Sequence, residues 1–189
     1  TITPGQYFEG IYVTDVFKVY EDKDYPTPSY VEWYDIRDQV KKVIFRDKIK
    51  PIGTEWWFCG MSYCEYYDLK NLDTSNVVRM FNMFHYASNY VDDVYLDIST
   101  FNTSNVERMD ALFLYFGSKA TNSVGVNVTG LDISKATDLS YLFFDFGRSA
   151  KEVSIIGLET WDTSNITNMS KMFTQCAEEA YTFSIGDIS

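Results

Sequence analysis

Five side chains, at two positions that recur along the chain, have the chemistry of a recognition site. Tyr66 and Tyr95 each stand nine residues before a serine of a repeated motif. Asp68, Asp97 and Asn127 stand seven residues before such a serine. Tyrosine brings contact area at a small entropic cost, and acidic or amide groups bring hydrogen bonds. These columns predict a surface that holds a protein strand, a loop or a glycan. The alternative is a sheet face that is simply solvated.

Residues that could support catalysis lack partners in the sequence. His85 is the single histidine, and nothing is spaced around it as a nucleophile or second base would be. The ten glycines form neither GxGxxG nor GxxxxGK, so no phosphate loop is predicted. The acidic pairs at 92–93 and 178–179 lack the spacing of a calcium loop. We therefore expect no enzyme, no bound metal and no cofactor.

The cysteines Cys59, Cys64 and Cys176 predict neither a disulfide framework nor a zinc site. Three is an odd and low number, and one histidine cannot complete a Cys/His set. A Cys59–Cys64 bridge stays open as an alternative. We favour small buried thiols.

One motif occurs four times and dominates the chain. Its copies span residues 72–84, 101–113, 131–143 and 161–173. Each copy has Asp or Asn second and Ser fourth, then apolar residues ending in phenylalanine, and the serines are 29 or 30 residues apart. A period of this length predicts a solenoid, in which each coil buries its apolar side against the next coil.

Each repeat predicts one strand and one short helix. Ser75 stands where a serine caps a helix, and Val77, Met80 and Phe84 recur at helical spacing. In the residues before each copy, every second residue is apolar, as on a strand with one buried face. The residues between them are predicted to point outward. Counted from the serines, the outward columns continue from Tyr66 and Asp68 to the residues Gly125, Ile155 and Gly157. Stacking gives a parallel sheet on one face and helices on the other.

The same count defines a predicted core. It comprises Val77, Met80, Phe84, Leu96, Ile98, Val106, Met109, Phe113, Val126, Val128, Leu139, Phe143, Ile156, Leu158, Ile166, Met169 and Phe173. A polar column, Asp73, Asn102, Asp132 and Asp162, precedes the serines. It serves either recognition or turn formation. We favour the turn, because Asp and Asn bond their own backbone there and every coil needs one.

Composition excludes several functional classes. The 46% hydrophobic content argues against wholesale disorder, and no run of about 18 apolar residues predicts a membrane span. The net charge is −11, almost all of it in residues 51–189. This charge argues against nucleic-acid binding and against docking on an anionic membrane. An acidic face for a basic partner is one interpretation, and solubility is the one we favour.

The first 50 residues differ from the rest. Residues 7–20 are rich in β-formers, Pro26 and Pro28 mark a loop, and residues 40–45 predict a strand. We therefore expect a β-rich N-terminal cap at 1–50 and a solenoid of four to five repeats at 51–189. The chain starts without Met and without signal-peptide features, which favours a fragment or processed form. No cap sequence follows the last coil, so we expect truncation or assembly through that open coil.

The repeats, together with residues 33–45, resemble the BspA-like leucine-rich repeats of bacterial surface proteins. The copy LDTSNVVRMFNMF at 72–84 carries the resemblance, which covers about residues 33–189. It implies an α/β, leucine-rich-repeat-like solenoid in a secreted or surface protein of bacteria, some protists or phages, associated with adhesion. The family has no catalytic site to carry over. This chain departs from the family in a longer spacing, with an insert at 116–123, and in Ile133-Ser134-Lys135 of the third copy.

Two functional hypotheses follow from the residues and the resemblance. The first is a non-enzymatic adhesion module, outside the cell or on its surface, that binds a protein or glycan of a host or neighbouring cell. The alternative is a structural or receptor-binding component of a phage virion, with its open coil covered by a neighbouring chain.

Overall fold

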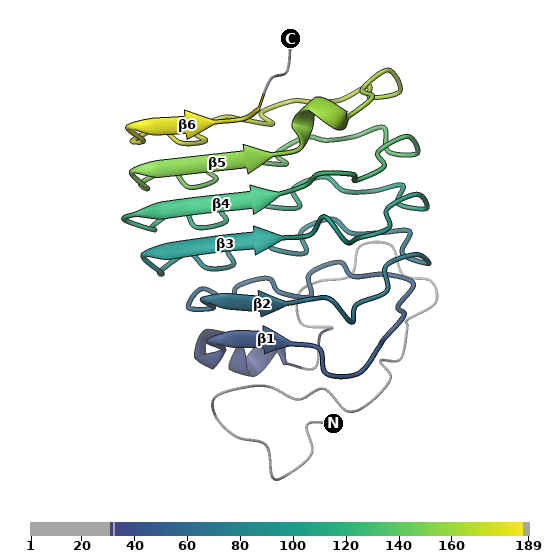
Figure 1. Ribbon diagram of the computed structural model, residues 1–189, viewed down its shortest axis with the longest axis horizontal. Coiled ribbons are helices and arrows are strands. Elements are labelled where there is room, and N and C mark those ends of the chain that lie inside the picture. Colours follow the sequence, from purple (N-terminus) through teal and green to yellow (C-terminus); the bar gives the residue numbers. More distant parts are fainter. Residues whose placement is uncertain (1–30, 32, 187–189) are drawn as a thin grey trace.

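The described part of the chain is a stack of parallel strands. The structure, a computed structural model, describes residue 31 and residues 33–186. The strands follow one another up the stack (Figure 1): β1 (Lys42–Ile44), β2 (Tyr66–Asp68), β3 (Asp93–Asp97), β4 (Ser123–Asn127), β5 (Glu152–Ile156) and β6 (Thr182–Ser184). β1 and β2 pair in a two-stranded sheet, and β3 to β6 form a four-stranded sheet. All these pairs are parallel, which confirms a parallel-strand solenoid.

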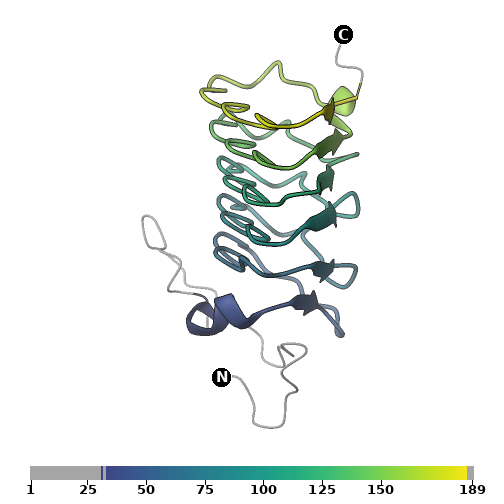
Figure 2. The ribbon, with the colours of Figure 1, turned by 90° about the vertical axis from the view of Figure 1, so that its left-hand side faces the viewer.

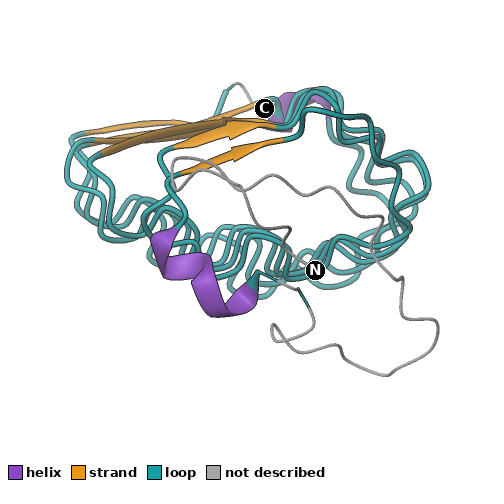
Figure 3. Ribbon diagram, turned by 90° about the horizontal axis from the view of Figure 1, so that it is seen from below, coloured by secondary structure: helices purple, strands orange, loops and turns teal. Residues whose placement is uncertain are grey.

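Each coil has a strand on one side and a chain of tight turns on the other (Figures 2 and 3). We call the outer surface of β1 to β6 the strand face. We call the opposite surface, formed by residues 54–62, 80–88, 109–117, 139–147 and 169–177, the turn face. The only helices in the described residues are the 3-10 helices η2 (Tyr34–Gln39) and η3 (Leu158–Thr160).

The prediction of a short helix in each repeat is wrong. The backbone of the turn face enters the left-handed region three times in each repeat. The first place has φ between 53° and 58° at Asn82, Ala111, Tyr141 and Lys171, and two more follow four and six residues later. A left-handed residue interrupts an α-helix. The apolar spacing of three and four residues, which fits a helix, is met here by successive turns that bury Met80, Met83 and Phe84.

Hydrogen bonding explains why turns replace a helix. The amide of Met83 bonds to the carbonyl of Met80 within its own turn, at 3.3 Å, but the amide of Phe84 bonds to the carbonyl of Leu112 in the next coil, at 2.9 Å. This alternation continues along the turn face. An isolated helix of two to three turns is marginal in water, because ordering its first turn costs more free energy than its few hydrogen bonds return. The turns instead direct every second amide to a neighbouring coil.

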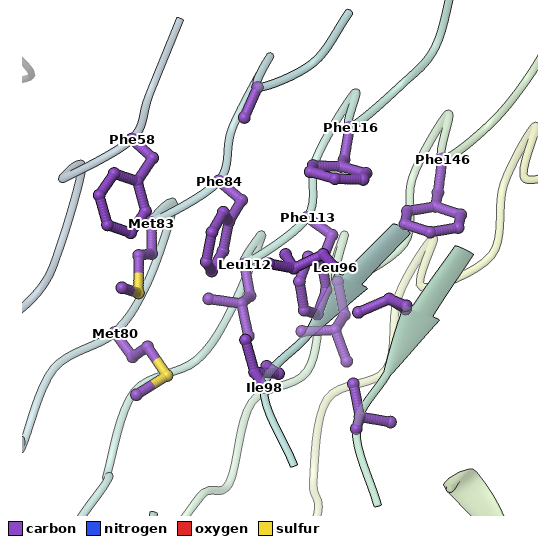
Figure 4. Packing of buried hydrophobic residues seen from close by; sticks show 14 of the residues in the cluster. Phe58, Met80, Met83, Phe84, Leu96, Ile98, Leu112, Phe113, Phe116 and Phe146 are labelled. Atoms are coloured by element: carbon purple, nitrogen blue, oxygen red, sulfur yellow. The ribbon is translucent and has the colours of Figure 1, made fainter. Parts of the chain in front are cut away.

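Stacked phenylalanines fill the core between the two faces (Figure 4). Ring centroids are 5.6 Å apart between Phe84 and Phe113, and 5.3 Å apart between Phe113 and Phe143. The rings of each pair are within 17° of parallel. Phe116 and Phe146 form a second column at 5.6 Å. Because the coils are nearly equal in length, equivalent side chains of successive coils lie above one another. The repeated phenylalanine of the sequence therefore becomes a column of rings.

The predicted core is confirmed from Val77 to Phe143 and wrong at several positions in the last coil. The twelve predicted residues through Phe143 are fully buried. Met169 is 46% exposed and Phe173 is 39% exposed. No further coil packs on them within the described residues.

The predicted register of β5 is also wrong by one residue. Ile155 pairs with Val126 and is buried, whereas Ile156 faces outward and is 44% exposed. Gly157 has a φ of 102° and opens η3, which lengthens this coil between the strand and the serine. Counting eight residues back from Ser164 therefore gives Ile156, which is one residue after the buried Ile155.

The predicted strand at 40–45 is confirmed as β1. Val43 of β1 pairs with Tyr67 of β2, so this segment continues the strand stack. The Trp33 indole donates a hydrogen bond to the carbonyl of Trp57, and the two rings pack edge to face with centroids 5.9 Å apart. The β-rich segment at 7–20 and the proline loop lie outside the described residues, and the boundary at residue 50 stays a prediction.

The phenylalanine column gives a matched pair of stability tests. Phe113→Ala leaves a cavity between two stacked rings, and we expect it to lower the free energy of unfolding by about 3–5 kcal/mol. Phe173→Ala removes a ring from the same column that is 39% exposed and stacks on Phe143. We expect Phe173→Ala to lower the free energy of unfolding by about 1 kcal/mol. Urea unfolding followed by circular dichroism measures both. Equal losses would contradict the stacked column as the centre of the core.

Candidate functional site

The two candidate tyrosines lie outward on the strand face, as predicted. Tyr66 on β2 is 50% exposed and Tyr95 on β3 is 54% exposed. Their neighbours along each strand, such as Tyr67 and Leu96, point inward and are partly or fully buried. β2 and β3 are neighbours in the stack (Figure 1), so the two tyrosines occupy the same column on adjacent coils.

The three polar candidates end their strands with side-chain turns. The Oδ1 atoms of Asp97 and Asn127 accept hydrogen bonds from backbone amides two residues later, at 2.9 and 3.1 Å. Asp68 makes the same contact with the amide of Lys70, at 3.4 Å. It also accepts from the Lys70 ammonium at 2.8 Å, and this bond lowers the pKa of Asp68 below its usual value. Each of these side chains therefore has a structural role, and the second polar atom of Asp97 and Asn127 has no partner among the described residues.

Register brings four of these outward positions together. Tyr95 pairs with Gly125, which pairs with Ser154, and Asp97 pairs with Asn127. Tyr95 and Asp97 are two residues apart on one strand and so share a face. Ser154 and Ile156 take the outward places that the sequence count gave to Ile155 and Gly157. The result is an exposed Tyr95 ring bordered by a glycine, a hydroxyl, a carboxylate and an amide, with the exposed Ile156 beside the amide and Tyr66 on the neighbouring coil.

Acidic groups at the start of β3 are held in a polar network. Asp93 accepts hydrogen bonds from the side chains of Asn122, at 2.7 Å, and Ser123. These bonds, the Ser123 hydroxyl first, lower the pKa of Asp93 below its usual value. Asp92 is bonded by the Thr121 hydroxyl. The carboxylates at 92–93 therefore tie neighbouring coils together.

The column of Asp and Asn before the serines forms turns, as expected. Asp73, Asn102, Asp132 and Asp162 each accept from the amide of the serine two residues later, at 2.9–3.1 Å. The serine hydroxyl, predicted to cap a helix, instead donates to Asp73 at 2.6 Å and to Asn102 at 2.7 Å. The serine belongs to a side-chain turn that leads into the turn face.

Sequence reasoning missed an aromatic column on the turn face. His85 stacks on Tyr86 with centroids 4.6 Å apart, Tyr86 stacks on Tyr115 at 4.5 Å, and Trp56 lies 5.7 Å from His85. Burial lowers the pKa of His85 to about 4, so the ring is neutral at pH 7. The ring nitrogens of His85 and the indole nitrogen of Trp56 have no hydrogen-bond partner among the described residues. The available signal was that Tyr86 and Tyr115 stand at the same place in consecutive repeats.

The three cysteines are free thiols. Burial raises the pKa of Cys59 and Cys176 to about 12, and that of Cys64 to about 11. The thiolate is the nucleophilic form, so these groups are poorly reactive at neutral pH.

Within residue 31 and residues 33–186, no three His, Cys, Asp or Glu side chains gather where a metal ion could bind. No helix in the same residues has the length and apolar character needed to cross a membrane.

Together, the stack of parallel strands, the turn face and the outward tyrosines define a solenoid repeat protein with a patterned strand face. A family model matches residues 54–154 and 144–184, and its description is "Mycoplasma protein of unknown function, DUF285". The chain belongs to this DUF285 family. No curated protein and no solved structure matches the chain.

The Asp73 turn predicts a specific pH dependence. Hydrogen bonds from the Ser75 hydroxyl and then the Ser75 amide hold the pKa of Asp73 at about 2, below its usual value of 3.8. A lowered folded-state pKa stabilises the fold above the unfolded-state pKa, and this contribution is lost as the pH falls through the folded-state value. The advantage of the wild type over Asp73→Asn should therefore be constant above about pH 5 and shrink between about pH 4 and pH 2.

Asp73→Asn is a matched variant because Asn102 makes the same turn in the next coil. Urea midpoints of the two proteins between pH 7 and pH 2 provide the measurement. A difference that does not change with pH would show that the charge of Asp73 contributes nothing to stability.

Proposed function

We propose that this chain is a non-enzymatic binding module of a surface or secreted protein, and that its strand face holds the partner. The single observation that carries the proposal is the pair of half-exposed tyrosines, Tyr66 on β2 and Tyr95 on β3, two strands that are neighbours in the stack (Figure 1). Exposed aromatic anchors provide much of the free energy of binding at protein interfaces. β4 pairs with β3 on one side and with β5 on the other, so this face presents side chains to a partner.

The family membership and the repeat motif support the same proposal. The matched residues, 54–184, contain all four copies of the motif that resembles the BspA-like leucine-rich repeats. Those repeats occur in proteins associated with adhesion. A location outside the cell or on its surface is part of the proposal. So is the partner, a protein or glycan of a host or neighbouring cell.

The test is capture of surface and matrix proteins, beside a glycan array, with the full chain and a Tyr66→Ala/Tyr95→Ala variant. We expect a specific ligand whose affinity falls about tenfold or more in the variant, because both anchors are removed. Tyr181→Ala is the control, since Tyr181 is 88% exposed and lies outside β2 and β3. The control should bind as the wild type does.

Two results would contradict the proposal. Full binding by the double variant would remove the strand face from recognition. No ligand, together with self-association in light scattering, would favour the alternative, an assembly component such as a virion protein.

A further inference from the structure

We infer that the strand-face site recognises a carbohydrate, with the Tyr95 ring as the surface on which a sugar ring stacks. This inference rests on the proposed function and names the class of ligand for the same site. It is carried by the way the chain seats Tyr95 over Gly125 and by the polar groups placed around that ring.

Gly125 leaves room for the Tyr95 ring. A Cβ added to Gly125 would lie 2.7 Å from Cδ2 and 3.2 Å from Cε2 of Tyr95, and 2.7 Å from the Ser154 hydroxyl. The ring therefore reaches across β4 and occupies the space of the missing side chain. The backbone does not require this glycine, because its φ is not in the left-handed region. Glycine inside a strand weakens it and often marks a close approach, which here is that of the tyrosine ring.

The Tyr95 ring is preorganised for binding, because its contact with Gly125 holds it in place. Tyr95 contacts the sheet along one side and is still 54% exposed. A ring already held in place loses little conformational freedom on binding. Pyranose rings present patches of C–H groups that pack on aromatic side chains, so an exposed and fixed ring suits them.

Polar groups lie near the ring on the same face. The Cα of Asp97 is two residues along β3, about 7 Å from that of Tyr95, and Asn127 pairs with Asp97 on the adjacent strand, about 4.8 Å away. Asp97 Oδ2 is an open acceptor, and the Asn127 side-chain amide is an open donor, because the Oδ1 atoms are already used. Ser154 adds a hydroxyl on the other side. Hydroxyl groups of a sugar donate to one such group and accept from the other.

The same surroundings disfavour the other partner classes. Protein anchors fill desolvated apolar pockets, whereas Tyr95 is 54% exposed and lies over Gly125, with Ser154, Asp97 and Asn127 around it. The nearest exposed apolar side chains are Tyr66 on β2 and Ile156, which pairs with Asn127. Nucleic acid is disfavoured by the net charge of −11. An exposed ring with a hydroxyl, a carboxylate and an amide beside it matches a ligand that is apolar on one side and hydroxylated at its rim.

The experiment uses the full chain and an array of oligosaccharides ending in β-linked galactose, glucose or N-acetylglucosamine. Calorimetry measures the affinity of the best oligosaccharide for the wild type and for Tyr95→Phe, Tyr95→Ala and Gly125→Ala. We expect Tyr95→Phe to stay within about threefold, because the ring remains, and Tyr95→Ala to lose about tenfold or more. Gly125→Ala keeps the tyrosine but should lower the affinity by a comparable factor, because the new methyl group displaces the Tyr95 ring.

Saturation-transfer NMR supplies an independent readout, with the largest transfer expected at the C–H protons of one sugar face. Urea unfolding of each variant shows that lost binding is not lost folding, and Tyr181→Ala is again the control. No bound oligosaccharide, or equal affinity in Tyr95→Ala, would overturn the carbohydrate assignment. Tyr95-dependent capture of a deglycosylated protein would also overturn it, yet would leave the proposed binding function intact.

Discussion

Backbone hydrogen bonds between successive coils, on both faces, are the interaction on which the rest of the structure depends. On the strand face they form the parallel ladders, and on the turn face every second amide bonds to a neighbouring coil, as Phe84 does to Leu112. These bonds fix the register between coils. Once register is fixed, equivalent side chains lie above one another, which produces the stacked phenylalanines inside and the ordered columns outside.

Much of this fold could be predicted from the sequence, because a period of 29–30 residues already fixes which residues are equivalent. Val77, Met109 and Phe143 are buried as their positions in the repeat require. The helices could not be distinguished from turns, since apolar residues three and four apart fit both. The deciding feature is left-handed backbone at residues such as Ala111 and Tyr141, and neither residue type signals that conformation.

The candidate site was predictable in its exposure and not in its contacts. Alternation along one strand is enough to place Tyr66 and Tyr95 outward. The seat of Tyr95 on Gly125 depends on the register between two strands, which the sequence shows only if every coil has the same length. Gly157 breaks that condition, and for this reason Ile155 and Ile156 exchange roles. The stacking of Tyr86 on Tyr115 depends in the same way on a turn path that the sequence does not reveal.

The ladder geometry also has a consequence for how such a protein can diversify. A coil of a solenoid contacts only its two neighbours, so gain or loss of one whole 29–30-residue unit by gene duplication or deletion leaves the remaining registers intact. Each added unit would lengthen the stack by about 4.8 Å. One outward column already carries Tyr95, Gly125 and Ser154 on three consecutive coils over a uniform interior. Outward residues can therefore be substituted in one coil at a time, while the buried residues and the backbone ladders stay the same.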